Sequence, residues 1–146
     1  AAIPKIETST RTARSLLPPS VAFADAVSNL RNASRITAAF FERKYEEARG
    51  AFSDRLHQPY RAALVPGLED AIESAEKAGA IGAFLSGAGP TVMAICLNSE
   101  AAIGQAMTKA LHKAGLESVD VQILSADNSG VQVVRFLPKN AREARC

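Results

Sequence analysis

The chain has 146 residues, of which 47% are hydrophobic and 22% charged, and its 17 basic and 15 acidic side chains leave a formal net charge of +2. This length suits one domain with its own core, and the balanced composition disfavours extended disorder, a collagen-like repeat and a coiled coil. Nucleic-acid and membrane-surface proteins usually carry a larger or clustered basic excess. We therefore expect a small-molecule or protein partner, and neither nucleic acid nor membrane.

The cysteines and the two ends of the chain bear on compartment and boundaries. Cys96 and Cys146 have no metal-ligand spacing and form no disulfide framework, which favours a reducing, cytoplasmic compartment. The first residue is Ala1 rather than Met, so we expect that sequence upstream of it is missing. We expect one domain over residues 1–137 and a loose polar tail over residues 138–146.

The first half of the chain is expected to be a strand followed by helices. Apolar periodicity and capping residues predict them in this order: a strand Ile3–Thr8 and helices over Thr10–Leu17, 20–41, Tyr45–Leu56 and 66–79. Ser20 is expected to cap the long second helix. The apolar positions of this helix recur every three or four residues and are expected to face the core: Phe23, Val27, Leu30, Ala33, Thr37 and Phe41. Pro59 is expected to end the third helix and leave His57–Val65 irregular.

The second half alternates strands with one helix. Two apolar runs, Ala80–Leu85 and Thr91–Leu97, are joined by a glycine turn, which predicts a hairpin. Ser99 is expected to cap a helix that ends at Gly115. After this helix we expect a strand, a turn and a second strand: Val119–Ile123, Asp127–Gly130 and Val131–Phe136. This order predicts an α+β sandwich of ferredoxin-like character, with helices on one face of a mainly antiparallel sheet.

The glycine turn is the first stretch that could carry chemistry. It reads Ser86-Gly87-Ala88-Gly89-Pro90-Thr91. Glycines flanking a small residue leave backbone N–H groups uncovered, so that a phosphate can approach closely. Alternatively, a tight hairpin between buried strands needs glycine without any ligand. Neither nucleotide-binding pattern, G-x-x-x-x-G-K-[ST] nor G-x-G-x-x-G, occurs in the sequence.

Arginines mark two further stretches. In Asp54–Arg61, a proline-stiffened segment carries Arg61, whose guanidinium suits a bidentate grip on a carboxylate or phosphate. His57 in the same stretch is interpreted as a donor at a helix C-terminus rather than as a catalytic base. Thr10 and Arg14 lie four residues apart, on one face of a short helix. The alternative for Arg14 is an ordinary surface arginine.

Three motifs together point to a family. They are Ser9-Thr10-x-x-Ala13-Arg14-x-x-Leu17-Pro18, Asp54-x-x-His57-x-Pro59-x-Arg61-x-x-Leu64-x-Pro66-Gly67 and Ser86-Gly87-Ala88-Gly89-Pro90-Thr91. In this combination the chain resembles the C-terminal half of the homoserine kinases, which belong to the small-molecule kinase superfamily of galactokinase and mevalonate kinase. The resemblance extends from Ile3 to about Val134. The second motif is specific to homoserine kinases, whereas the glycine turn is shared across the superfamily.

The resemblance implies roles for matched positions only. Arg14 and Arg61 match the arginines that bind the carboxylate of L-homoserine, and Thr10 matches a threonine near the substrate. The turn matches the loop near the phosphates of ATP and substrate, and its residues are Ser86, Gly87, Ala88 and Gly89. The resemblance assigns no catalytic residue and no metal ligand to this half of the enzyme, and the fold it implies is the ferredoxin-like C-terminal domain.

The implied activity is transfer of the γ-phosphate of ATP to the homoserine hydroxyl with Mg²⁺, a step of threonine biosynthesis. The chain lacks the P-x-x-x-G-L-G-S-S-A loop with which the N-terminal half of these kinases holds ATP. We therefore expect a C-terminal domain that is inactive without its N-terminal domain, in the cytoplasm or, for a plant source, the plastid stroma. The resemblance leaves open whether the enzyme is a homodimer. The alternatives are another kinase of the superfamily, or a non-catalytic ferredoxin-like module that binds an amino acid or dimerises.

Overall fold

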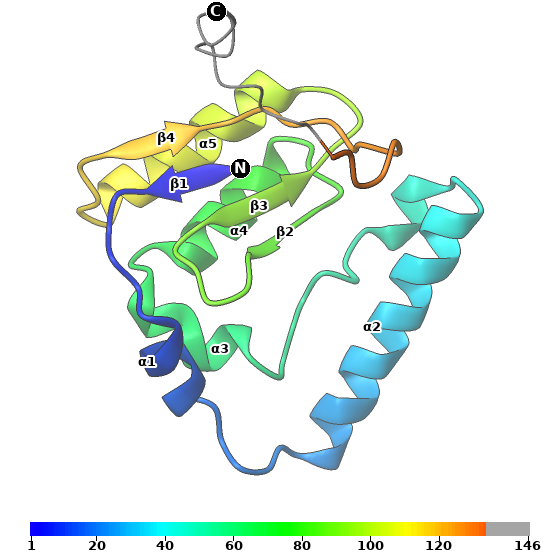
Figure 1. Ribbon diagram of the computed structural model, residues 1–146, viewed down its shortest axis with the longest axis horizontal. Helices are drawn as coiled ribbons and strands as arrows, with labels where there is room; N and C mark the ends of the chain where they lie inside the picture. The colour runs from blue at the N-terminus through cyan, green and yellow to red at the C-terminus, as the bar shows by residue number, and fades with distance from the viewer. Residues whose placement is uncertain (134–146) are drawn as a thin grey trace, which may run out of the picture.

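A four-stranded antiparallel sheet forms the centre of the chain, in the computed structural model that describes residues 1–133. The strand order is β2-β3-β1-β4, and the strands are β1 (Ala2–Pro4), β2 (Gly82–Leu85), β3 (Val92–Ile95) and β4 (Val119–Val121). Helices α4 (Leu68–Lys77) and α5 (Glu100–Lys113) lie side by side against one face of this sheet (Figure 1). The expected α+β, ferredoxin-like architecture is confirmed.

The main core lies between the sheet and this helix pair. Helix α4 covers Leu68–Lys77 and α5 covers Glu100–Lys113. Their buried side chains meet those of the strands, and the largest of these are Leu68, Leu85, Val92, Ile103, Met107 and Leu111. Gly67 precedes α4 with φ +79, and a Cβ there would lie 2.6 Å from the Cβ of Ala114. Glycine therefore permits the close approach between the start of α4 and the end of α5.

The N-terminal elements are shorter than expected. The strand covers Ala2–Pro4 rather than Ile3–Thr8, and it lies inside the sheet between β3 and β4. Pro4 ends it and is not at an edge, contrary to its usual placement in sheets. Helix α1 covers Thr10–Ser15, and its N-cap is Ser9, whose hydroxyl accepts a hydrogen bond from the Thr12 N–H at 3.4 Å.

The prediction for residues 45 to 65 is wrong in two places. The expected helix over Tyr45–Leu56 is only a 3₁₀ turn, η1 (Tyr45–Ala48), because Gly50 at φ +75 redirects the chain. Where an irregular segment was expected, α3 (Gln58–Arg61) is followed by the 3₁₀ turn η2 (Ala62–Leu64). A proline in the first turn of a helix removes an N–H that has no partner within the helix, so Pro59 supports α3 and does not end a helix.

The long helix α2 (Phe23–Phe41) ends where expected but begins after the predicted start at residue 20, and its apolar side faces away from the core. Its buried residues are Asn32 and Ala39. The six positions expected to face the core are all exposed: Phe23, Val27, Leu30, Ala33, Thr37 and Phe41. A periodic pattern shows that a helix has two different sides, but it does not show which of them packs on the same chain. Figure 1 shows α2 set apart from the sheet along most of its length.

Two predicted caps and the last strands also need correction. Neither the Ser20 hydroxyl nor the Ser99 hydroxyl accepts a capping hydrogen bond. The residue before α2 is Ala22, and Ser99, the residue before α5, has φ +66. Strand β4 ends at Val121 instead of Ile123. The turn at 127–130 forms around a hydrogen bond from the Ser129 N–H to Asp127 Oδ1, at 2.7 Å.

The last part of the chain lies only partly within the described range. Residues 131–133 are not in a strand, contrary to the prediction for Val131–Phe136, and residues 134–136 lie outside the described residues, as does the predicted tail. The domain boundary at residue 137 stays a prediction. None of the helices within 1–133 has the length and hydrophobicity that a bilayer crossing requires.

Candidate substrate-binding site

The three stretches that the sequence singles out meet at Arg61. Its Nε donates a hydrogen bond to the carbonyl oxygen of Ala13 in α1, at 3.2 Å. Its Nη1 donates to the carbonyl oxygen of Gly87 in the glycine turn, at 2.8 Å. A guanidinium carries five N–H groups, and Nη2 has no hydrogen-bond partner within residues 1–133. Arg61 therefore joins α1, α3 and the turn and still has donors for a ligand.

Helix α3, which carries Arg61, is held by Asp54. The Oδ2 atom of Asp54 accepts hydrogen bonds from the backbone N–H groups of Leu56, His57 and Gln58, at 3.2, 2.7 and 2.6 Å. Its Oδ1 accepts a hydrogen bond from Asn29 Nδ2, at 2.6 Å. Burial raises the pKa of Asp54, but the hydrogen bonds led by the one from Gln58 outweigh it and hold the pKa below its usual range. The ionised carboxylate thus fixes the start of α3.

Gln58 ties the same helix to the sheet. Its Oε1 accepts a hydrogen bond from the backbone N–H of Leu85, at 2.7 Å, where β2 leads into the glycine turn. We predicted no role for Asn29, Asp54 or Gln58. The polar run around Pro59 was a signal for Asp54 and Gln58, because an Asp side chain often accepts hydrogen bonds from backbone N–H groups a few residues further along the chain.

His57 does not have the role that we predicted. It is the residue before α3 and not a donor at a helix C-terminus. Its Nδ1 lies 3.5 Å from Nη1 of Arg61, and its Nε2 lies 3.8 Å from Oδ2 of Asp54. The ring thus stands between the carboxylate that caps α3 and the arginine that ends it.

The glycine turn itself is a tight hairpin connection. The Ser86 N–H donates to the Thr91 carbonyl at 2.9 Å, and the Gly89 N–H to the Ser86 carbonyl at 3.0 Å. Gly87 has φ +57 and Gly89 has φ +84. The N–H groups of Gly87 and Ala88 have no acceptor among the described residues. Two unpaired amides next to an arginine make a surface that is suited to an anion.

Arg14 and Thr10 lie on α1, the helix that Arg61 contacts through the Ala13 carbonyl. Arg14 follows Ala13, the residue whose carbonyl Arg61 contacts. Its side chain is exposed and makes no hydrogen bond or ion pair within residues 1–133. Thr10, the first residue of α1, is also exposed. Both side chains are accessible to a ligand, and neither is used to hold the fold.

A cavity of about 620 Å³ separates the chain before α1 from the glycine turn. Its wall includes Thr8, Thr12 and Gly89, but neither Thr10 nor either arginine. The Thr8 hydroxyl is buried and has no hydrogen-bond partner within the described range. Buried hydroxyls normally have a partner, so Thr8 is a polar group of this region that sequence reasoning missed.

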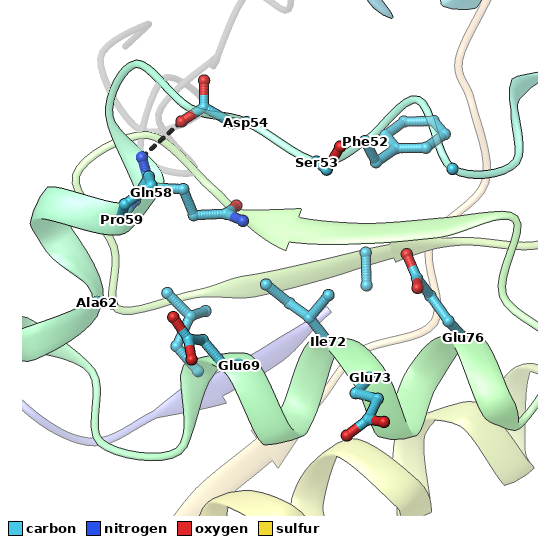
Figure 2. A pocket seen from close by; sticks show the side chains of 13 residues that line it. Phe52, Ser53, Asp54, Gln58, Pro59, Ala62, Glu69, Ile72, Glu73 and Glu76 are labelled. Carbon is cyan, nitrogen blue, oxygen red and sulfur yellow. Dashed lines mark hydrogen bonds between the residues drawn. The ribbon is translucent and has the colours of Figure 1, made fainter. Parts of the chain in front are cut away.

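A second cavity, of about 290 Å³, lies between α4 and the segment from residue 50 to residue 62 (Figure 2). Figure 2 shows acidic side chains around it, and its charged residues are Asp54, Glu69, Glu73 and Glu76. Four carboxylates repel a carboxylate or phosphate ligand. The candidate site for an anion is therefore the surface around Arg61 and not this cavity.

No three His, Cys, Asp or Glu side chains gather within residues 1–133 in a way that could hold a metal ion.

Comparison of the sequence with known proteins gives a family and several relatives. The family described as "GHMP kinases C terminal" matches residues 36–113. The homoserine kinase of Aquifex aeolicus is 41% identical over 131 residues, which cover 90% of this chain and 44% of the relative. The homoserine kinase of Halothermothrix orenii is 40% identical over 129 residues, which cover 88% of this chain and 41% of the relative.

The fold comparison agrees with the sequence comparisons. The crystal structure of homoserine kinase from Cytophaga hutchinsonii superposes with a TM-score of 0.75 at 30% identity, and the match covers 82% of this chain and 38% of that structure. The chain thus spans less than half the length of the relatives that it matches.

Proposed function

Because the chain belongs to the GHMP kinases, through the C-terminal domain of that family, we propose that it is the substrate-binding domain of a homoserine kinase. In this proposal the intact enzyme transfers the γ-phosphate of ATP to the hydroxyl of L-homoserine, within threonine biosynthesis. The hydroxyl oxygen forms a bond to the γ-phosphorus and gives up its proton, the bond from that phosphorus to the bridging oxygen breaks, and ADP leaves. ATP as donor favours the cytoplasm.

Recognition of the substrate carboxylate falls to Arg61 and Arg14. The observation that carries the proposal is the position of Arg61, between α1 and Gly87. Its two backbone hydrogen bonds hold the guanidinium in place, so little freedom is lost when a carboxylate binds to Nη2. The exposed, unpaired side chain of Arg14, on the helix whose Ala13 carbonyl Arg61 contacts, is assigned as the second cation. We assign Thr10, at the start of the same helix, to contact with the substrate.

The turn from Ser86 to Gly89 is assigned to the phosphate side of the reaction. The unpaired N–H groups of Gly87 and Ala88 can donate to the oxygens of the phosphoryl group. Phosphoryl transfer depends on positioning of the reactants and on stabilisation of negative charge. We assign both of these roles to the turn and the arginines of this chain. Mg²⁺ would accompany the ATP phosphates, and we assign none of the residues 1–133 to it. The nucleotide would be held by the N-terminal part that the relatives possess and this chain does not span.

Titration of the purified chain with L-homoserine, followed by NMR or calorimetry, tests the proposal. We expect saturable binding that Arg14→Ala weakens at least tenfold, with perturbed backbone signals in α1 and in the turn from Ser86. Mevalonate and galactose serve as control ligands, because they are substrates of other kinases of the superfamily and lack the α-amino acid group. Equal binding of these controls, or homoserine binding that is indifferent to both arginines, would contradict the proposal.

A further inference from the structure

The outward side of α2 carries a continuous apolar stripe. We name this stripe the outer stripe. Its residues follow one another at alternating spacings of four and three: Phe23, Val27, Leu30, Ser34, Thr37 and Phe41. Its large side chains are 85% exposed at Phe23, 48% at Val27, 70% at Leu30 and 89% at Phe41. A 19-residue helix is about 28 Å long. The stripe runs along this whole length and is therefore different from the single exposed leucines that are normal on protein surfaces.

The two hydroxyl residues of the outer stripe do not make it polar. Ser34 Oγ donates a hydrogen bond to the carbonyl oxygen of Leu30, and Thr37 Oγ1 to that of Ala33, both at 2.9 Å. Because these hydroxyls are satisfied by the helix itself, a partner can cover the stripe without supplying polar groups.

The flanks of the stripe are small. On a helical wheel the neighbouring positions are Ala26, Ala33 and Ala38, with Arg31 as the one charged residue. Paired helices of a coiled coil usually carry charges at such flanking positions, which select the partner helix. Alanine flanks instead widen the apolar face and let a broader surface approach the backbone of α2. This favours a folded domain over a second copy of the helix.

Polar contacts prevent α2 from turning its stripe inward. Asn32, on the opposite side, is only 8% exposed, and its Nδ2 donates to the Ser53 carbonyl at 3.1 Å. Asn29 Nδ2 donates to Asp54 Oδ1 at 2.6 Å, and the Asn29 Oδ1 accepts from the Arg55 N–H at 2.8 Å. Rotation of the helix would break these hydrogen bonds and bury amides without partners, and both effects oppose it.

We propose that the outer stripe of α2 is the docking face for the N-terminal domain of the same kinase. The inference rests on the proposed function. It starts from the length of the matched relatives, because more than half of each relative lies outside the region that this chain matches. Large contiguous apolar patches on soluble proteins mark interaction sites. On its inner side, α2 contacts Asp54 through Asn29, and Asp54 accepts a hydrogen bond from the first residue of α3. The docked domain would therefore also stabilise the position of α3, which carries Arg61.

Hydrogen exchange tests the docking face. The part of the Aquifex aeolicus homoserine kinase that this chain does not match is fused ahead of the full 146-residue chain, so that even a weak interface forms within one molecule. We expect amide exchange over residues 23–41 to slow at least tenfold in the fusion, relative to the chain alone. Leu30→Glu and Phe41→Glu should each abolish this protection. Ala101→Glu, at an exposed position of α5, is the matched control and should leave the protection intact.

Two outcomes would overturn the proposal. One is exchange over residues 23–41 that is equally fast in the fusion and in the chain alone. The other is a chain that sediments as a dimer by itself and becomes monomeric with Leu30→Glu, since the occupant would then be a second copy. Homoserine binding by the chain alone should be the same with and without Leu30→Glu, because the stripe contacts neither arginine. A failure of docking is therefore distinguishable from a failure of the proposed function.

Discussion

The Nη1 atom of Arg61 donates a hydrogen bond of 2.8 Å to the carbonyl oxygen of Gly87, so the arginine that ends α3 also holds the glycine turn. Its Nε reaches Ala13 of α1 at the same time. One side chain thus connects segments that are 48 and 26 residues away from it in sequence. Its structural and ligand-binding roles have to be separated by experiment, and Arg14 provides the comparison.

Arg61→Ala is expected to lower both stability and affinity. Loss of two hydrogen bonds from a charged donor should reduce the free energy of unfolding by about 1–3 kcal/mol. Homoserine affinity should fall by a factor of about ten to a hundred, which is about 1.5–3 kcal/mol. Urea denaturation and homoserine titration measure the two effects. Arg61→Lys should recover little of either, because an ammonium group cannot make both backbone bonds in the geometry of the guanidinium.

Arg14→Ala is expected to lower affinity alone. Because this exposed side chain has no partner within residues 1–133, its removal should change the free energy of unfolding by less than about 0.5 kcal/mol. Homoserine binding should nevertheless weaken at least tenfold. Arg11→Ala, in the same helix, is the control, since it removes the same charge and should leave binding within about twofold. If both variants lowered homoserine affinity equally, Arg14 would be an ordinary surface arginine with no specific role in binding.

Asp54 is expected to make stability depend on acid pH. Its pKa is lowered in the folded chain, so its ionised form stabilises the fold above the unfolded pKa of about 3.9. This contribution is lost as the pH falls through the lower, folded pKa. Urea midpoints measured between pH 7 and pH 3 should therefore fall at the acid end, and less so in Asp54→Asn. Asp120→Asn is the control, because Asp120 makes only an exposed ion pair with Lys5, at 3.8 Å.

The two glycines of the turn are expected to differ on substitution. Both have positive φ, which costs an alanine about 1 kcal/mol. A Cβ on Gly87 would meet nothing within 4 Å, whereas a Cβ on Gly89 would lie 3.1 Å from Leu85 Cδ1 and 3.4 Å from Val65 Cγ2. Thermal unfolding should thus show a larger loss for Gly89→Ala, about 2 kcal/mol, than for Gly87→Ala. A reversed order would mean that the buried neighbours of Gly89 move aside easily.

Much of the fold follows from local pattern. The hairpin around the glycine turn, helix α4 after Gly67 and helix α5 before Gly115 were all predicted, because alternation, periodicity and glycine caps act within a few residues. The helix at Gln58–Arg61 was not, since it depends on a side chain outside it. Only when Asp54 accepts three backbone N–H groups does Pro59 lie inside a first helical turn.

The sequence by itself determined the composition of the chain, the arginines and glycines of the candidate site, and the existence of a two-sided helix at residues 23–41. Only the tertiary structure decided that Arg61 joins Ala13 to Gly87, and that Asn32 rather than Leu30 faces the core. The physical reason is the same in both cases. Hydrophobic periodicity is a property of one segment, whereas a hydrogen bond across 48 residues, or the choice of the side that packs, depends on which other segments are present.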